Sequence, residues 1–232
     1  MQNDPGDFDL ERKLEDWAAA ESSIRVSSEL TRSIQATLNR SLTAVKPVPS
    51  QGTLWLVFMT LFMGCAGLLI MLTSRVGIHL MTPVQLGGIS VVLIAIGILF
   101  VAKLVEQMIP GSQSRVSQST VLTFGGIGLF GGLAILFPWQ SSPHFVSEGW
   151  PCAVLELAAG VPVTGIFWLL ARRGTLFASA GLGATLTGIA ALVVLIPLQF
   201  QCMFQQAPHL LVWHGGAALL LIGLGAILGR RP

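Results

Sequence analysis

The sequence has 232 residues, of which 53% are hydrophobic and only 10% are charged, and its mean hydropathy is +0.74. This composition excludes an ordinary soluble domain and indicates an integral membrane protein. The formal net charge is only +2, but the first 50 residues hold eight acidic and six basic residues, against three and seven in the rest. We therefore expect a polar head over residues 1–50 and a membrane domain over residues 51–232. The acidic N-terminus lacks an apolar core, so it does not resemble a signal peptide.

The head is predicted to form two amphipathic helices, over residues 7–20 and 27–42. In each, apolar side chains recur at helical spacing along one narrow side. Neither helix can bury much apolar area alone, so each needs a partner surface. A protein partner is favoured over a lipid surface, because the head is acidic. The residues expected to contact that partner are Leu14, Trp17, Leu30, Ile34 and Leu38. Residues 45–50, VKPVPS, carry two prolines and predict an extended connector.

Six apolar runs follow the connector, each long enough to cross a hydrocarbon core of about 30 Å. We place them at residues 54–73, 85–107, 120–138, 151–171, 177–199 and 209–229. The connections are short, so consecutive helices should be antiparallel neighbours. Small residues recur along several runs and predict close helix packing. The expected fold class is all-α: a polytopic membrane protein with a bundle of six transmembrane helices and a short amphipathic helical head.

The distribution of basic residues predicts the orientation of the bundle. With the N-terminus inside, the outer loops receive only Arg75, whereas the Arg172–Arg173 and Arg230–Arg231 pairs fall on the cytoplasmic side. Such a bias places both termini in the cytoplasm. The outer face then collects His79, His144, Glu148, Cys152, Cys202 and His209.

Cys152 and Cys202 are candidates for a sensing site at this outer face. They could form a reversible disulfide, or share a soft metal ion with His144, His209 or Glu156. The alternative is that both are small apolar fillers at helix ends, or that they form one structural disulfide. A third cysteine, Cys65, lies deep in the first run, where packing is the simpler interpretation.

Three further titratable residues lie near these cysteines. Glu156 follows Cys152 by four residues, on the same helical face and one turn deeper. It is interpreted as a metal ligand, a proton-sensitive switch, or a helix-start carboxylate that favours the positive end of the helix dipole. His209 and His214 are five residues apart, so an α-helix does not place them on one face. We expect His214 to hydrogen-bond across the bundle instead.

The remaining signals point away from catalysis. Lys103 and Glu106 lie at the inner end of the second run, where snorkelling of the lysine to the interface accounts for its charge. The sequence contains no nucleophile elbow, HExxH zinc motif, phosphate-binding loop or dinucleotide fingerprint. We therefore expect no enzyme activity and no cofactor. Opposed histidines at matched depth, which haem ligation needs, are not evident either.

The order of these landmarks resembles the NrsF-type membrane anti-sigma factors, six-helix negative regulators of extracytoplasmic-function sigma factors. The resemblance covers most of residues 40–231. It rests on the VKPVPS connector, a cysteine at the outer start of the fourth helix, Arg172-Arg173-Gly174 after that helix, a cysteine after the fifth, Pro208-His209 and Trp213-His214 opening the sixth, and Gly229-Arg230-Arg231 at the end. The family commonly has a proline after the second cysteine, whereas this chain has Met203.

The resemblance implies a bacterial inner-membrane protein whose head holds an extracytoplasmic-function sigma factor and releases it on an outer-face signal, often metal or oxidative stress. By resemblance the paired outer cysteines are Cys152 and Cys202. Their position near these cysteines, and not the resemblance, adds Glu156 and His209 to the candidate sensing set. The head has no zinc ligands of the type found in other anti-sigma heads, so it should bind without metal and without contacting nucleic acid directly. A second hypothesis is a small transporter or metal-handling protein using Glu156 and His214, and a third is a structural membrane subunit.

Overall fold

The structure is a computed structural model of the chain, and it describes residues 12–13, 15–17, 28–41, 49–73, 76–109, 116–140, 142–171 and 179–230. The chain divides into two compact units, Met1–Pro47 and Val48–Pro232. The first unit contains α2, Ser28–Ser41, which is the second of the two head helices expected from the sequence. Of the first expected helix, residues 12–13 and 15–17 are described, and they are helical.

Two of the five apolar residues assigned to the partner surface have described side chains. Trp17 is 77% exposed and Ile34 is 49% exposed. The side chains of the other three lie outside the described residues: Leu14, Leu30 and Leu38. Both described side chains are therefore unburied within their unit.

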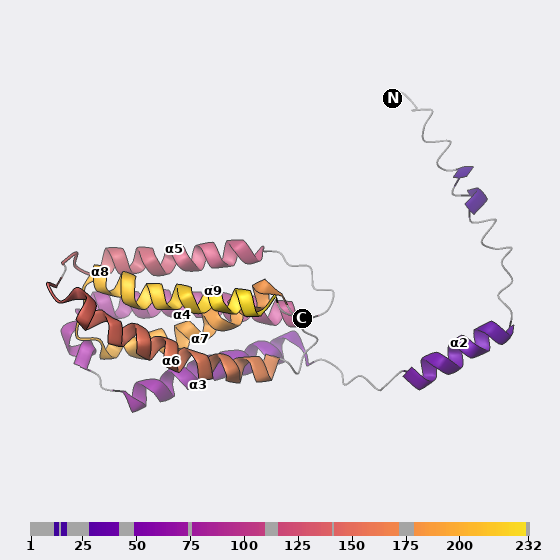
Figure 1. The fold of residues 1–232 in the computed structure, drawn as a ribbon, viewed down its shortest axis with the longest axis horizontal. Coiled ribbons are helices and arrows are strands. Elements are labelled where there is room, and N and C mark those ends of the chain that lie inside the picture. Colours follow the sequence, from indigo (N-terminus) through magenta and orange to yellow (C-terminus); the bar gives the residue numbers. More distant parts are fainter. Residues whose placement is uncertain are drawn as a thin grey trace, which may run out of the picture. The chain divides into compact units, whose positions relative to one another are not determined.

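The second unit is a helical bundle whose long helices lie alongside one another (Figure 1). Six helical segments are long and apolar enough to cross a membrane, which confirms the predicted fold class. Five are α3 (Gln51–Leu72), α4 (Pro83–Met108), α5 (Gln118–Leu136), α6 (Phe145–Ala171) and α7 (Ala180–Gln201). The sixth is built from α8 (Ala207–His209), the π-helical turn η2 (Leu210–Gly215) and α9 (Gly216–Leu228), and a short 3₁₀ helix, η1 (Val76–Leu80), precedes α4.

Side-chain caps fix where several of these helices begin. Thr82 and Gln85 form a capping box at the start of α4: the Gln85 backbone N–H donates to Thr82 Oγ1 at 3.3 Å, and the Thr82 N–H donates to Gln85 Oε1 at 2.9 Å. These bonds satisfy backbone donors that a helix start leaves unpaired. Gln85 Nε2 also donates to the Leu136 carbonyl at 3.0 Å, so the same side chain ties the start of α4 to the end of α5.

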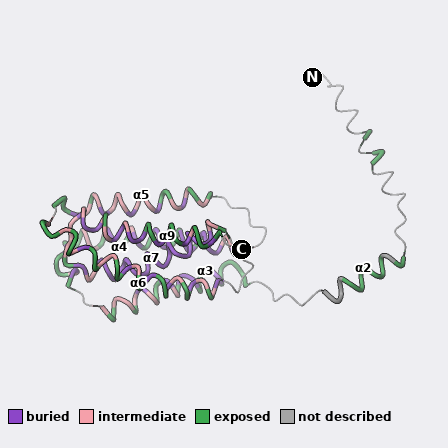
Figure 2. The backbone as a smooth tube through the Cα atoms, viewed as in Figure 1, coloured by how far each residue is buried: buried purple, intermediate pink, exposed green. Residues whose placement is uncertain are grey.

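Helix α7 is the centre of the bundle. Every residue from 182 to 199 is buried, and the helix packs against α3, α4, α6 and α9 (Figure 2). A helix that is apolar on all sides is expected in such a position. Its contact with α9 is close because of glycine: a Cβ at Gly183 would collide with the Gly225 carbonyl, so the two backbones can approach only without side chains there. The small-residue packing expected from the sequence is present at this contact.

A polar network joins three helices at the end of the bundle where α9 ends, which we call the C-terminal end. Gln118 Nε2 of α5 donates to Thr185 Oγ1 of α7 at 2.7 Å, and Gln107 Nε2 of α4 donates to Gln118 Oε1 at 2.7 Å. The start of α7 is therefore held to both α4 and α5 by side-chain hydrogen bonds.

Lys103 differs from the sequence interpretation. It is buried, with Nζ 2.9 Å from Glu106 Oε2 and 2.6 Å from the Val116 carbonyl oxygen. The lysine therefore does not snorkel, because a carboxylate and a carbonyl within the bundle already satisfy its charge. Its bond to Val116 also links α4 to the residues just before α5.

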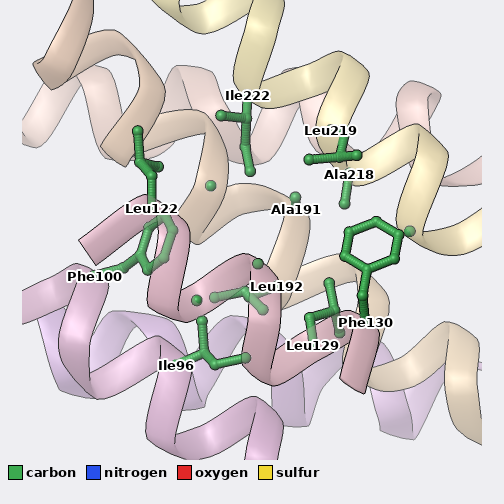
Figure 3. Close-up of a pocket in the computed structure, with 14 residues that line it drawn as sticks. Ile96, Phe100, Leu122, Leu129, Phe130, Ala191, Leu192, Ala218, Leu219 and Ile222 are labelled. Carbon is green, nitrogen blue, oxygen red and sulfur yellow. The ribbon is translucent and has the colours of Figure 1, made fainter. Parts of the chain in front are cut away.

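Between α4, α5, α7 and α9 lies an apolar cavity of about 100 Å³. Figure 3 shows the side chains that line it, including Phe100, Leu129, Phe130 and Leu219. Glycines and aliphatic or aromatic side chains form the whole lining, so the cavity offers nothing to bind a charged ligand.

Candidate functional site

The opposite end of the bundle, which we call the α8 end, carries the residues that the sequence analysis singled out. Cys202 directly follows α7 and begins a short loop whose shape is set by Gln205. Gln205 Nε2 donates to the Cys202 carbonyl at 2.7 Å and to the Gln199 carbonyl at 3.0 Å. The loop is anchored again where the Ala207 N–H donates to the Pro138 carbonyl at 2.9 Å. These bonds hold Cys202 in place although it lies outside a helix.

Helix η1 supports the same loop from the other side. A Cβ at Gly77 would lie 2.5 Å from the Cys202 carbonyl oxygen and 2.7 Å from that of Phe200. Both distances are too short for non-bonded atoms, so the backbone of η1 approaches the Cys202 loop only because residue 77 has no side chain. The position of Cys202 therefore depends on η1 as well as on Gln205.

The π-helical turn η2 brings two histidines together. At its end the Gly216 N–H donates to the Leu211 carbonyl, five residues earlier, which is the hydrogen bond of a π-helix. The ring centroids of His209 and His214 are 5.6 Å apart. The expectation that these histidines cannot share a face was wrong, because the wider π turn aligns residues i and i+5 where an α turn aligns i and i+4.

Helix α6 contributes Cys152 and Glu156. It begins at Phe145, six residues before the expected start, so Glu156 lies about three turns inside the helix. The helix-start interpretation of this carboxylate was therefore wrong, because the helix dipole acts on the first turn only. Glu156 is 0% exposed, and neither of its oxygens has a hydrogen-bond partner.

Cys152, Cys202, His209 and His214 form one group, which we call the Cys2His2 cluster. Each offers one sulfur or nitrogen atom, and these four atoms all lie within 4.8 Å of one another. The Cys202 sulfur is 3.5 Å from His209 Nε2. Three members are buried and Cys152 is half-buried, and the described cysteines are all unbridged. The cluster is therefore assembled from α6, the end of α7, α8 and η2.

Buried polar atoms without a hydrogen bond of ordinary geometry lie in the cluster and beside it. His214 is completely buried and neither ring nitrogen makes such a bond, although the Cys152 thiol of α6 lies beside the ring. Both oxygens of Glu156, one turn deeper than Cys152 on α6, are also without a hydrogen bond. Most buried polar groups in proteins are paired, so an orphaned group of this kind requires an explanation. A ligand that the residues are arranged to receive is one such explanation.

Aromatic side chains pack between the elements that carry the cluster. The rings of Phe145 and Trp213 have centroids 5.6 Å apart, and a Cβ at Gly149 would collide with the Trp213 ring. Glycine at position 149 thus lets α6 and η2 pack directly against each other. The Phe204 ring centroid lies 5.3 Å from that of His209, so this histidine ring packs against an aromatic neighbour.

The structure brings together most, but not all, of the predicted sensing residues. Cys152, Cys202 and His209 meet in the cluster, and Glu156 lies one turn deeper than Cys152 on α6. His144 is exposed and lies outside the cluster, whereas His214 lies within it. Cys65 packs against the hydrophobic core, as its packing interpretation implies.

Sequence reasoning missed His214 as a member because it assumed a regular α-helix. The signal that could have found it is the coincidence of two histidines and two cysteines at one predicted membrane face.

Comparison with known proteins places the chain in a family. Residues 38–232 match the NrsF family, whose description is negative regulator of sigma F. The match covers the whole bundle, including every member of the Cys2His2 cluster. No curated protein and no solved structure matches the chain. Because the family match extends over well more than half of the sequence, the chain belongs to the NrsF family of negative regulators of sigma F.

Proposed function

We propose that this protein is a membrane-bound anti-sigma factor that holds an extracytoplasmic-function sigma factor through its N-terminal head and releases it when a signal reaches the Cys2His2 cluster. Membership of the NrsF family is the observation that carries this proposal, because negative regulation of a sigma factor implies a sigma factor as partner. Regulators of this kind are generally not enzymes, in keeping with the lack of a catalytic motif in the sequence.

The head is the part of the chain best suited to hold the partner. A tryptophan that is 77% exposed on a short helix is a strong candidate for a binding anchor, since tryptophan is over-represented among residues that dominate interfaces. Ile34 on α2 is a second exposed apolar residue, on a helix whose other described side chains are exposed and polar or small. Two short helices of this type can lie in apolar grooves of a folded partner.

The proposed orientation puts the head and the sigma factor in the same compartment. The excess of basic residues in alternate loops favours cytoplasmic termini, which places the C-terminal end of the bundle inside and the α8 end outside a bacterial inner membrane. The Cys2His2 cluster then faces the outer compartment, where metal ions and oxidants arrive. This arrangement separates the site of the signal from the site of sequestration.

Helix α7 is the element best placed to connect the two faces. It ends at Gln201, directly before Cys202 of the cluster, and its first turns carry Thr185, which is bonded to Gln118 in the network at the C-terminal end. Because it is buried along its whole central length, it cannot shift without displacing its neighbours. A change in the cluster would therefore be transmitted as a switch between two packed arrangements of the bundle.

The transporter hypothesis has less support. Among the described residues, the buried polar or charged side chains gather towards the two ends of α7: Lys103, Thr185 and Thr187 towards one end, and Glu156, Gln199, His209 and His214 towards the other. The central segment of α7, residues 188–198, carries no polar side chain. A path for an ion needs polar groups through this middle layer.

The proposal is tested by affinity purification of the tagged protein from detergent-solubilised membranes, beside a version that lacks residues 1–45. Bound proteins are identified by mass spectrometry. We expect a sigma factor to copurify with the full chain and to be lost with the truncated one. A sigma factor that binds both versions equally would contradict sequestration by the head. Absence of a sigma factor from both would contradict the anti-sigma function.

A further inference from the structure

We propose that the Cys2His2 cluster is the binding site of a single thiophilic metal ion with a closed d shell, Zn²⁺ or Cu⁺, and that His209 and His214 are ligands together with Cys152 and Cys202. This inference deepens the proposed function by naming the ligand of its sensing site. It does not depend on the head, because the ion would bind whether or not a sigma factor is held.

The spacing of the four donor atoms fits one ion. Zinc lies about 2.3 Å from a cysteine sulfur and about 2.0 Å from a histidine nitrogen, so tetrahedral ligands of these two kinds are about 3.5 Å apart. The Cys202 sulfur and His209 Nε2 already stand at 3.5 Å. The other pairs lie within 4.8 Å, so small rotations of the side chains bring all four atoms to bonding distance.

The chemistry of the donors selects the class of ion. Two sulfurs and two imidazole nitrogens suit Zn²⁺ and Cu⁺, whereas Mg²⁺ and Ca²⁺ require oxygen ligands. Charge balance favours the divalent member of the pair. Two thiolates neutralise Zn²⁺, whereas with Cu⁺ they leave one negative charge buried beside the carboxyl group of Glu156, which is costly in an apolar bundle.

The orphaned atoms provide evidence that is independent of the spacing. His214 is 0% exposed and neither ring nitrogen makes a hydrogen bond of ordinary geometry, so an ion bonded to one nitrogen and to the neighbouring Cys152 sulfur supplies the interaction that the fold leaves incomplete. A histidine that binds metal usually donates its other N–H to a carboxylate, a carbonyl or water. Glu156 is a completely buried, unpartnered carboxyl one turn below Cys152, and it is the group we assign to position the ligands.

The local backbone also fits a binding role. The π turn η2 is what places His209 and His214 on one face, and single π turns within helices occur frequently at functional sites. A plain α-helix over residues 207–228 would carry the same apolar surface without aligning the two histidines. The π turn is therefore required to align His209 with His214. It is not required for the helix to span the membrane.

The test is direct metal binding to the full-length protein, purified in detergent, fully reduced and stripped with a chelator. Zn²⁺ and Cu⁺ are added separately, the bound ion is counted by elemental analysis after desalting, and affinity is measured by competition with a chromogenic chelator. We expect one ion per chain, and a loss of affinity of about 100-fold or more in His214→Gln and in His209→Gln, since even outer partners of a metal site contribute about 10- to 100-fold.

Two variants serve as matched controls. His144→Gln removes an exposed histidine at the same end of the bundle, and Cys65→Ser removes a cysteine that packs elsewhere in the core. Both should bind the ion as the wild type does. Equal binding by wild type and His214→Gln, or no binding of either ion by the wild type, would overturn the proposal.

A measurement on the wild type alone guards against variants that fail to fold. X-ray absorption at the edge of the bound ion reports the ligands directly, and we expect two sulfur and two nitrogen neighbours. A shell without nitrogen, or without sulfur, contradicts the assignment. A chain that binds no ion but oxidises to a Cys152–Cys202 disulfide also contradicts it, while leaving head-dependent capture of a sigma factor intact. Failure of the metal site is thus distinguishable from failure of the proposed function.

Discussion

The rings of His209 and His214 lie with their centroids 5.6 Å apart, although five residues of sequence separate them. The π turn between them changes the register of the sixth span, so that both side chains meet Cys152 and Cys202. The π turn therefore allows His209 and His214 to supply two of the four donor atoms of the cluster.

Replacing Gly77 should disturb the cluster from outside it. Gly77→Val would force the η1 backbone away from the Cys202 carbonyl, because the Cβ alone would stand 2.5 Å from that oxygen. We expect a loss of stability of about 1–3 kcal/mol, the usual cost of overpacking, and weaker binding of the ion. Thermal unfolding in detergent and the chelator competition measure the two effects. Gly87→Val is the control, since a Cβ at Gly87 meets nothing within 4 Å. It should change neither the stability of the protein nor its affinity for the ion.

Glu156 should be destabilising in the ion-free protein. Both carboxyl oxygens are buried without a partner, so Glu156→Leu removes a desolvated polar group that makes no compensating bond. We expect the unfolding free energy to rise by about 1–3 kcal/mol, the cost of an unsatisfied buried group, while ion affinity falls. Glu156→Gln keeps a polar group in place and should gain less stability. A Glu156→Leu variant that is less stable than wild type would show that the carboxyl has a partner in the folded protein.

The head should lose its partner when charges are placed on its apolar side. Leu30→Asp combined with Ile34→Asp puts two carboxylates where apolar contact is expected, and we predict that sigma-factor capture is abolished while membrane insertion is intact. Gln35→Asp introduces one such charge at an exposed polar position of α2 and should leave capture unchanged. Copurification measures capture, and fractionation of membranes measures insertion. If the double variant captures the sigma factor as well as the wild type does, α2 is not part of the interface.

The polar network at the C-terminal end should matter for signalling and not for ion binding. Gln118→Leu removes the bonds from α5 to Thr185 and Gln107, and leaves the Thr185 hydroxyl only its bond to the Gly181 carbonyl. We expect sigma-factor release on addition of the ion to be altered, with ion affinity within about threefold of wild type, because the network lies at the far end of α7. Ser119→Leu, on the same helix, is the control. If Gln118→Leu releases the sigma factor as the wild type does, α7 is not the connecting element.

The sequence predicted the spans well because long apolar runs leave few alternatives in a membrane. It missed the true start of α6 because residues 145–150 mix polar and aromatic side chains, and because Pro151 is typical of a first helical turn. In the structure Pro151 lies inside the helix, which begins at Phe145. This shift decides how Glu156 is understood, since it places the carboxylate too deep for the helix dipole to stabilise it.

The cluster could be predicted only in part, for a physical reason. Topology alone brings Cys152, Cys202 and His209 to one membrane face, since all three lie towards the same end of consecutive antiparallel helices. The membership of His214 depends on a single hydrogen bond of π type, which hydrophobic periodicity does not encode. The burial of Lys103 at the other end of the bundle could not be predicted from the sequence either. Its charge is satisfied by Glu106 on the same helix and by the carbonyl of Val116, a contact that hydrophobic periodicity does not encode.

We expect a change at the Cys2His2 cluster to release a sigma factor held by the head. To measure this release, the full-length protein is reconstituted with its copurified sigma factor in lipid nanodiscs, and the released fraction is determined after addition of Zn²⁺, Cu⁺ or a thiol oxidant. The wild type is expected to release the sigma factor with at least one of these, and Cys152→Ser is expected to remain locked in one state. Release from Cys152→Ser equal to that from the wild type would contradict the account.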